Sequence, residues 1–178
     1  TSIIGGLVAG TTYKIRVYTN GNNINQSASF TLCITTPAPI TNDECATATP
    51  AAVNQGLDCV LVTPGSITGA TASPQPSTCP GAEDDDVWFS FVATSATHII
   101  TLQNIVGTAT TLNSSLYTGT ECGSLTFISC NNNNQTLVNN LIPGNTYLIR
   151  VWSGSSQLED IQFNLCIGTI VPPITVST

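Results

Sequence analysis

The sequence predicts an all-β protein: an antiparallel β-sandwich of the jelly-roll type, stapled by disulfides and repeated in tandem. Most segments alternate apolar and polar residues with a period of two, as half-buried strands do, and Gly, Pro, Asn and Ser separate them. No segment carries an apolar stripe of helical period that begins at a capping residue, so long helices are not expected. Seven cysteines in 178 residues add the disulfides to this prediction.

One piece of the chain occurs twice. Leu7–Tyr18 (LVAGTTYKIRVY) returns as Leu141–Trp152 (LIPGNTYLIRVW), and Phe30–Cys33 (FTLC) returns as Phe163–Cys166 (FNLC). Solenoid repeats have periods of roughly 20–50 residues, so a much longer separation indicates a whole domain. We therefore predict four regions: the C-terminal strands of a preceding repeat at 1–36, a linker at 37–41, a complete β-sandwich repeat at 42–169, and a Pro-containing linker to a next repeat at 170–178.

The strands of the complete repeat follow from their residue types. In 86–92 (DVWFSFV), Val and two Phe residues alternate with Asp, Trp and Ser, and 147–152 and 162–167 alternate in the same way. One helical turn is predicted at Asp43–Ala48, capped by Asn42 or Asp43. Further strands are predicted at 59–63, 66–70, 97–103, 113–117, 125–129 and 135–139.

Charged residues are scarce and mostly acidic. They make up 7% of the chain, where about a quarter is usual, and three basic residues against ten acidic ones give a net charge of −7. Nucleic acid is excluded as a partner, because binding it requires clustered Lys and Arg. No apolar run approaches the ~20 residues of a membrane span, so no membrane insertion is expected.

The cysteines predict an extracellular, oxidising location. The complete repeat holds six cysteines, an even number, which predicts three disulfides. A metal site is the other interpretation, but the sequence contains no Cys-x-x-Cys pair that would favour it. Cys122 and Cys130 flank a short segment that is expected to fold back as a hairpin, so we predict that they pair. Cys33 is the counterpart of Cys166, and its partner is expected in the preceding repeat. Pairing is left open among Cys45, Cys59, Cys79 and Cys166.

An acidic run leads into the strand at 86–92. Glu83, Asp84, Asp85 and Asp86 repel one another unless a cation or a basic side chain neutralises them. One interpretation is calcium bound by the three aspartates, because calcium takes six to eight oxygen ligands. The other is a solvated acidic loop in which Asp86 alone pairs with Arg150. The sequence leaves both interpretations open.

A few side chains are candidates for ligand contact. Trp88 and Trp152 fall on strand faces opposite the main apolar set, where aromatic rings either stack on sugars or cover a sheet surface. Arg150 would either grip a ligand or pack structurally and pair with an acid. The one histidine, His98, is predicted at a surface position of a strand. Because no nucleophile–base pair is visible, we expect no enzyme.

A family likeness is carried by the order of motifs in residues 42–169. These motifs are NDECA at 42–46, GAT at 69–71, DVWFSF at 86–91, LYTG at 116–119 and GNTYLIRV at 144–151, with cysteines at 79, 122 and 130. Their order resembles the Cys-containing repeats of large secreted Bacteroidetes surface proteins, including gliding-motility adhesins exported by the type IX secretion system. It is also similar to the bacterial pre-peptidase C-terminal domain, a jelly-roll module of secreted enzymes. The resemblance implies a secreted or cell-surface protein whose sandwich domains act as spacers, binders or both.

The sequence therefore predicts a non-enzymatic structural or adhesive repeat of a long extracellular adhesin or filament. Its expected partners are neighbouring repeats of the same chain and, as a further ligand, a surface polysaccharide or another cell-surface molecule. One alternative is a carbohydrate-binding accessory module of a secreted enzyme. Another is a subunit that polymerises into filaments by β-strand complementation. Calcium is the one cofactor under consideration.

Overall fold

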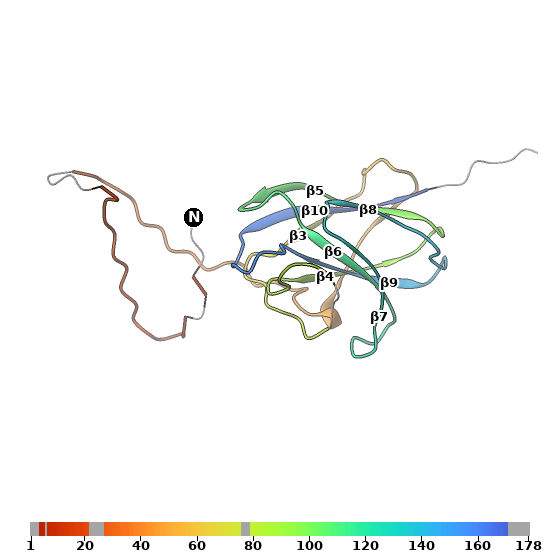
Figure 1. Cartoon of the computed structure of the whole chain (residues 1–178), viewed down its shortest axis with the longest axis horizontal. Coiled ribbons are helices and arrows are strands. Elements are labelled where there is room, and N and C mark those ends of the chain that lie inside the picture. The colour runs from red at the N-terminus through yellow and green to blue at the C-terminus, as the bar shows by residue number, and fades with distance from the viewer. Residues whose placement is uncertain (1–3, 6, 22–26, 76–78, 171–178) are drawn as a thin grey trace, which may run out of the picture.

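Two β-sheets pack face to face, which confirms the predicted β-sandwich (Figure 1). The computed structural model of the chain describes residues 4–5, 7–21, 27–75 and 79–170. The first sheet has the strand order β1-β4-β9-β6-β7, and the second has the order β2-β10-β5-β8, with β3 also paired to β10. The elements are η1 (Cys45–Thr47), β1 (Thr49–Pro50), β2 (Val53–Asn54), β3 (Thr63–Ser66), β4 (Val87–Val92), β5 (His98–Gly107), β6 (Asn113–Thr118), β7 (Thr126–Asn131), β8 (Gln135–Val138), β9 (Thr146–Trp152) and β10 (Ile161–Thr169).

The sheets are mixed rather than purely antiparallel, which corrects one detail of the prediction. β1 runs parallel to β4 and β2 runs parallel to β10, whereas the other pairs between named strands are antiparallel. The reason is that β1 and β2 belong to one short segment, residues 49–54, which joins an edge of the first sheet and then crosses to the second. β9 and β10, by contrast, each lie in the interior of a sheet.

Two of the predicted strands are wrong. Residues 59–63 contribute only the first residue of β3, because Asn54 holds this segment as a loop. Its Oδ1 accepts a hydrogen bond from Leu61 N and its Nδ2 donates one to Leu61 O, each 2.8 Å long. Of residues 66–70, only Ser66 is in a strand, as the last residue of β3, and residues 67–70 form a turn closed by a backbone hydrogen bond of 3.0 Å. The other predicted strands of the complete repeat are found, with ends shifted by a few residues.

The core between the sheets is built by the alternation that the sequence displays. In β4, Val87, Phe89 and Phe91 point into this core and are almost fully buried. Burying a side chain of this size contributes roughly 1.5–3 kcal/mol to stability, which makes these strands the main source of the fold's cohesion. The residues that β9 and β10 add to the same core are Tyr147, Ile149, Val151, Ile161, Phe163, Leu165 and Ile167.

A second, smaller apolar cluster covers the outer face of the first sheet. Trp88 and Leu148 point away from the main core and pack with Tyr117 and Cys45. The ring centroids of Trp88 and Tyr117 lie 5.5 Å apart. The disulfide between Cys45 and Cys122 fastens η1 to the loop after β6. Both faces of the first sheet are therefore buried around β4 and β9.

The helical turn predicted at Asp43–Ala48 is present as η1, but its predicted caps are wrong. Glu44 is the N-cap residue and makes no side-chain capping hydrogen bond. Asn42 Nδ2 instead donates to Trp88 O at 2.8 Å, and the Asp43 carboxylate accepts two bonds of 2.7 Å from the loop after β3. These bonds tie the start of the repeat to β4 and to the loop after β3.

The disulfides differ from the predicted pairing of Cys122 with Cys130. Within the described residues the pairs are Cys45–Cys122, Cys59–Cys166 and Cys79–Cys130. The predicted pair is wrong because residues 123–129 do not fold back on themselves. They continue into β7, which pairs along β6 and carries Cys130 to a position opposite Ser115. Cys33 is a free, exposed thiol here, and its partner in a preceding repeat stays a prediction.

The first copy of the repeated sequence takes a different form from the second. Where they are described, residues 7–34 contain no strand, and Figure 1 shows them as an open loop beside the sandwich. Their apolar side chains are exposed, with Ile15 at 54% and Ile34 at 74%. The equivalent residues of the second copy, Ile149 and Ile167, are 1% and 0% exposed. One copy of this repeated sequence thus lies inside a core, and the other, similar copy lies outside it.

The remaining sequence predictions concern the chain's C-terminal end and membranes. Apart from Ile170, the linker predicted at 170–178 lies outside the described residues. In the part of the chain that the structure describes, no helix is long and apolar enough to cross a membrane.

Candidate functional site

The densest polar cluster of the fold surrounds Arg150 in β9. The residue is 1% exposed, so its guanidinium is buried beneath the loops that cover the first sheet. Nη1 lies 2.6 Å from Glu83 Oε2, and Nη2 lies 2.9 Å from Asp86 Oδ1. The carbonyl oxygens of Gln75 and Ser73 accept further bonds of 2.9 and 3.4 Å. The structural interpretation of Arg150, paired with Asp86, is therefore confirmed.

Asp86 links this cluster to β4. Besides Arg150, its carboxylate accepts hydrogen bonds from Ser73 N at 2.8 Å, Ser73 Oγ at 2.5 Å and Trp88 Nε1 at 2.9 Å. Four donors satisfy this buried carboxylate, as an ionised group out of water requires. Burial works to lower the pKa of Arg150, but the hydrogen bond to Asp86 and the charges of Asp86 and Glu83 outweigh it and raise that pKa. The guanidinium therefore stays charged.

The residues predicted as ligand contacts are not available at the surface. Trp88 and Trp152 are 0% exposed, and Arg150 is as deeply buried. Their burial leaves no exposed ring or guanidinium for a ligand to contact in this structure, and ligand contact at these residues stays an untested prediction. Among the described residues of the sandwich, Phe127 is the one exposed aromatic ring. A flat aromatic platform for sugar stacking is not assembled from these side chains.

The three aspartates predicted as calcium ligands do not converge on one point. Asp86 belongs to the Arg150 cluster, whereas Asp85 Oδ1 accepts a hydrogen bond from Ser153 N at 3.0 Å. Asp84 Oδ1 and Asp85 Oδ2 are buried without a hydrogen-bond partner among the described residues. No group of three or more His, Cys, Asp or Glu in the described ranges is placed to hold a metal ion. These residues do not fit a calcium ion, and calcium binding remains an untested prediction.

His98 is buried, which corrects its predicted surface position. Its Nδ1 lies 3.1 Å from Gly168 O, and its Nε2 accepts hydrogen bonds of 3.2 Å from Thr94 N and Ser95 N. These partners place the proton on Nδ1, and burial lowers the pKa of the ring. Because both nitrogens are engaged, the ring is not free to act as a general base. The signal that sequence reasoning missed is the alternation with Ile100, which puts His98 on the core face of β5.

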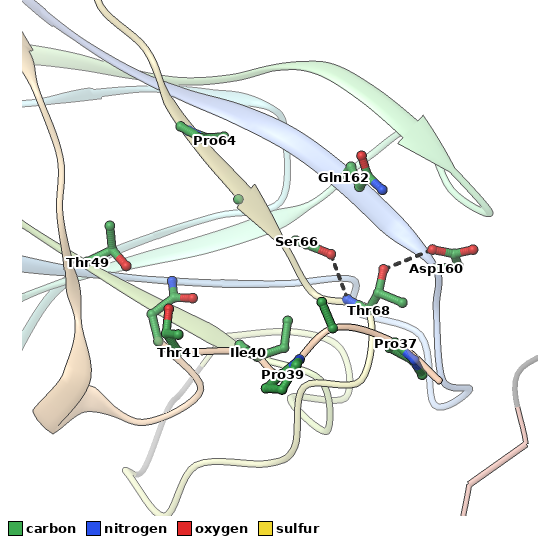
Figure 2. A pocket seen from close by; sticks show the side chains of 13 residues that line it. Pro37, Pro39, Ile40, Thr41, Thr49, Pro64, Ser66, Thr68, Asp160 and Gln162 are labelled. Atoms are coloured by element: carbon green, nitrogen blue, oxygen red, sulfur yellow. Dashed lines mark hydrogen bonds between the residues drawn. The ribbon is translucent and has the colours of Figure 1, made fainter. Parts of the chain in front are cut away.

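An open groove of about 620 Å³ lies where residues 37–42 meet β3 and β10 (Figure 2). The Thr68 hydroxyl donates to Asp160 Oδ1 at 2.9 Å at one end of it, and Gln162 lies beside them. The lining offers hydroxyl, amide and carboxylate groups but no aromatic ring. Such groups are able to hydrogen-bond a sugar or another polar ligand. Sequence reasoning did not predict this groove, because it forms between segments that are far apart in the chain.

The comparisons with known proteins agree with a sandwich module. Residues 41–165 match the family described as galactose binding domain-like, a family associated with the type IX secretion system. A search of curated proteins finds no match. The family supports the type IX secretion and Bacteroidetes part of the predicted resemblance. Together with the disulfides, it indicates a secreted or cell-surface protein.

Proposed function

Because the chain belongs to the galactose binding domain-like family associated with the type IX secretion system, we propose that it is part of a long extracellular adhesin or filament. In this proposal residues 42–169 form one complete, non-enzymatic structural repeat, and residues 1–36 end the repeat before it. The main partners are the neighbouring repeats of the same chain. Adhesion to a cell-surface ligand would then come from many weak contacts along the array, which add through effective concentration.

The observation that carries this proposal is that residues 7–34 keep the turn that precedes β9 without the strand partners. Val8 N donates to Tyr13 Oη at 2.8 Å, just as Ile142 N donates to Tyr147 Oη at 2.8 Å. The apolar side chains of the first copy are exposed, whereas those of the second fill the core. An unpaired apolar strand face of this kind requires other strands to cover it.

The strand order indicates what covers the exposed apolar side chains of residues 7–34. They are expected to pack against the remaining strands of a preceding repeat on the same polypeptide. β9 lies between β4 and β6, and β10 lies between β5 and the pair β2 and β3. A sandwich without β9 and β10 would be divided in both sheets, so it would not persist as a folded acceptor. Complementation by a strand from another chain needs such an acceptor. A covalent tandem array is therefore the better-supported account than a polymerising subunit.

The non-enzymatic part of the proposal is supported by the bonds that the reactive side chains already make within the fold. Arg150 and Asp86 neutralise each other inside the fold, and both nitrogens of His98 are hydrogen-bonded to backbone groups. Six cysteines are committed to disulfides. No nucleophile–base pair remains among these groups, which supports a non-enzymatic role.

The test is the mass of the native polypeptide after reduction and boiling. A band far above the 18.5 kDa of this chain is expected from covalent tandem repeats. A band near that mass would overturn the array. Hydrogen exchange provides a matched comparison: in this chain alone, amides of 7–34 should exchange rapidly and those of 146–169 slowly. In the native polypeptide both segments should exchange slowly.

A second candidate, a carbohydrate-binding accessory module, is supported by the family description and by the groove at residues 37–42. It predicts saturable binding of one oligosaccharide in a galactose-containing panel, measured by calorimetry. Gln162→Ala should abolish that heat, whereas Gln55→Ala, an exposed glutamine outside the groove, should not. Absence of binding by the unaltered chain across the panel would reject this candidate.

A further inference from the structure

The connectivity of the three disulfides points to a mechanical function. We propose that they form a graded series under tension, in which only one disulfide is loaded at a time. The order of loading is Cys59–Cys166, then Cys45–Cys122, then Cys79–Cys130. This inference rests on the proposed function, because a repeat inside an extracellular array is pulled through the segments that enter and leave it.

Tension would act along the sandwich. Figure 1 shows the segment before residue 42 entering at one end of the sandwich and β10 ending at the opposite end. β2 runs parallel to β10, with Val53 opposite Ile167. Pulling β2 by its N-terminal end and β10 by its C-terminal end slides the two strands past one another. Their hydrogen bonds therefore bear the load together, in shear, rather than opening one after another.

The first disulfide provides the shortest covalent route through the repeat. From residue 42 this route follows the chain to Cys59, crosses to Cys166 and leaves through Thr169. The chain between the two cysteines, a sequence separation of 107, is bypassed and carries no load. Before this route is taut, η1, β1, β2 and the last residues of β10 have to detach, and Cys45 draws Cys122 and the loop after β6 with it. The oxidised repeat thus yields little length, because the chain between Cys59 and Cys166 stays off the load path.

Cleaving that first disulfide transfers the tension to the second. The shortest route then crosses from Cys45 to Cys122 and follows the chain to β10, so that a sequence separation of 77 is still bypassed. When this bond is cleaved as well, the route crosses from Cys79 to Cys130, which bypasses a separation of 51. Cleaving the last bond exposes the whole repeat to tension.

Each cleavage releases a defined length. At about 3.6 Å per extended residue, the three events release about 110, 90 and 180 Å in the order of loading. Cleavage in another order would give a different pattern. In particular, losing the second or third disulfide releases no length while Cys59–Cys166 is intact, because neither lies on the taut route. The repeat would therefore yield in increments, with a successively shorter part of the chain bypassed at each stage.

The experiment is force-clamp stretching of the full 178-residue chain, held by its two ends, before and after dithiothreitol is added. Each cleavage oxidises one dithiol to its cyclic disulfide, while the protein disulfide takes up two electrons and two protons to become two thiols. Before the dithiol is added, we expect the chain to extend only until the residues outside the Cys59–Cys166 loop are taut, and then to stop. After it, we expect steps of about 110, 90 and 180 Å in that order. A single long step, or steps in another order, would overturn the proposal.

Two matched variants test the order directly. The double change Cys59→Ser and Cys166→Ser should lengthen the oxidised, stretched repeat by about 110 Å, whereas Cys45→Ser with Cys122→Ser should leave its length unchanged. Equal lengthening in both would contradict the proposal. Should a variant not fold, the step pattern of the unaltered chain decides alone. A native polypeptide with the mass of this chain on the denaturing gel would overturn the tandem array but would not change the predicted extension steps. Failure of the proposed function and failure of the loading order can therefore be told apart.

Discussion

The two copies of one sequence in this chain differ in their surroundings, and the difference separates local from long-range encoding. Both copies make the same turn: Gly10 and Gly144 adopt φ of 81° and 89°, a left-handed conformation that glycine favours. Only the second copy forms the strands β9 and β10, because only that copy is flanked by partner strands. The turn is therefore specified by its own residues, whereas strand geometry is supplied by neighbours.

The largest expected effect comes from removing the same arginine in each copy. Arg150→Ala leaves the buried carboxylate of Asp86 and the partly exposed carboxylate of Glu83 without their partner. Breaking a buried ion pair in this way costs about 3–5 kcal/mol. Arg16→Ala removes an arginine that lies 5.6 Å from the exposed ring of Tyr18, and it should leave the free energy of unfolding almost unchanged. Urea denaturation of both variants measures the contrast, and equal losses would contradict it.

Shortening the same isoleucine in each copy tests how much each copy contributes to core packing, rather than to charge pairing. Ile149→Ala opens a cavity in the core and should cost about 2–5 kcal/mol, whereas Ile15→Ala in the exposed first copy should cost close to nothing. The measurement is the same denaturation experiment on this chain. In a longer polypeptide that includes the preceding repeat, both substitutions should destabilise. If Ile15→Ala does not change the free energy of unfolding of that longer polypeptide, the first copy is not the end of a preceding repeat.

Periodicity made part of this structure predictable. The alternation in β4 predicts Val87, Phe89 and Phe91 on one face, and the scarcity of other bases makes Arg150 one of two candidate partners for Asp86, which the ion pair confirms. These features depend on residues within one strand or on the few charges available, so they can be seen in the sequence.

The features that sequence reasoning missed depend on how distant segments meet. The partner of Cys130 follows from the pairing of β7 with β6, which no local pattern specifies. Trp88 was placed on the correct face, but its burial depends on loops that have no periodicity, including the one that carries Ser73. The groove beside Asp160 forms only when the segment at 37–42 lies against β3 and β10.

A third contrast concerns the pH dependence of stability. Two buried titratable groups contribute to it: Asp85, which is hydrogen-bonded to Ser153 just after β9, and His98, which is hydrogen-bonded to Gly168 in β10. Burial raises the pKa of Asp85 to about 6, hydrogen bonding to Ser153 opposes this, and the charges of Asp84 and Glu159 add to the rise. Above pH 6 the folded protein must hold this buried charge, whereas the unfolded chain titrates near 3.8. Asp85 therefore costs roughly 2–3 kcal/mol at neutral pH, and this cost disappears as the pH falls towards 4.

Asp85→Asn should accordingly stabilise the protein at pH 7 by about 2 kcal/mol and match the unaltered chain near pH 4. His98 acts in the opposite direction, because burial lowers its pKa. Its stabilisation is present above pH 6.5 and is lost as the pH falls through the lower folded-state pKa. Denaturation at pH 7 and pH 4 should show the variant losing more stability on acidification than the unaltered chain. Equal losses would contradict the assignment of a buried charge to Asp85.

The smallest expected effect tests the turn that the two copies share. Tyr147→Phe removes the hydroxyl that accepts from Ile142 N, and the net loss should be about 1 kcal/mol because water reaches that exposed amide. Tyr13→Phe removes the matching bond to Val8 N, but it should not change global unfolding, since the first copy is outside the core. Its effect should appear instead as faster hydrogen exchange at Val8. If that exchange rate does not change, the turn of the first copy is not held by its tyrosine, and local encoding of the turn would rest on Gly10 alone.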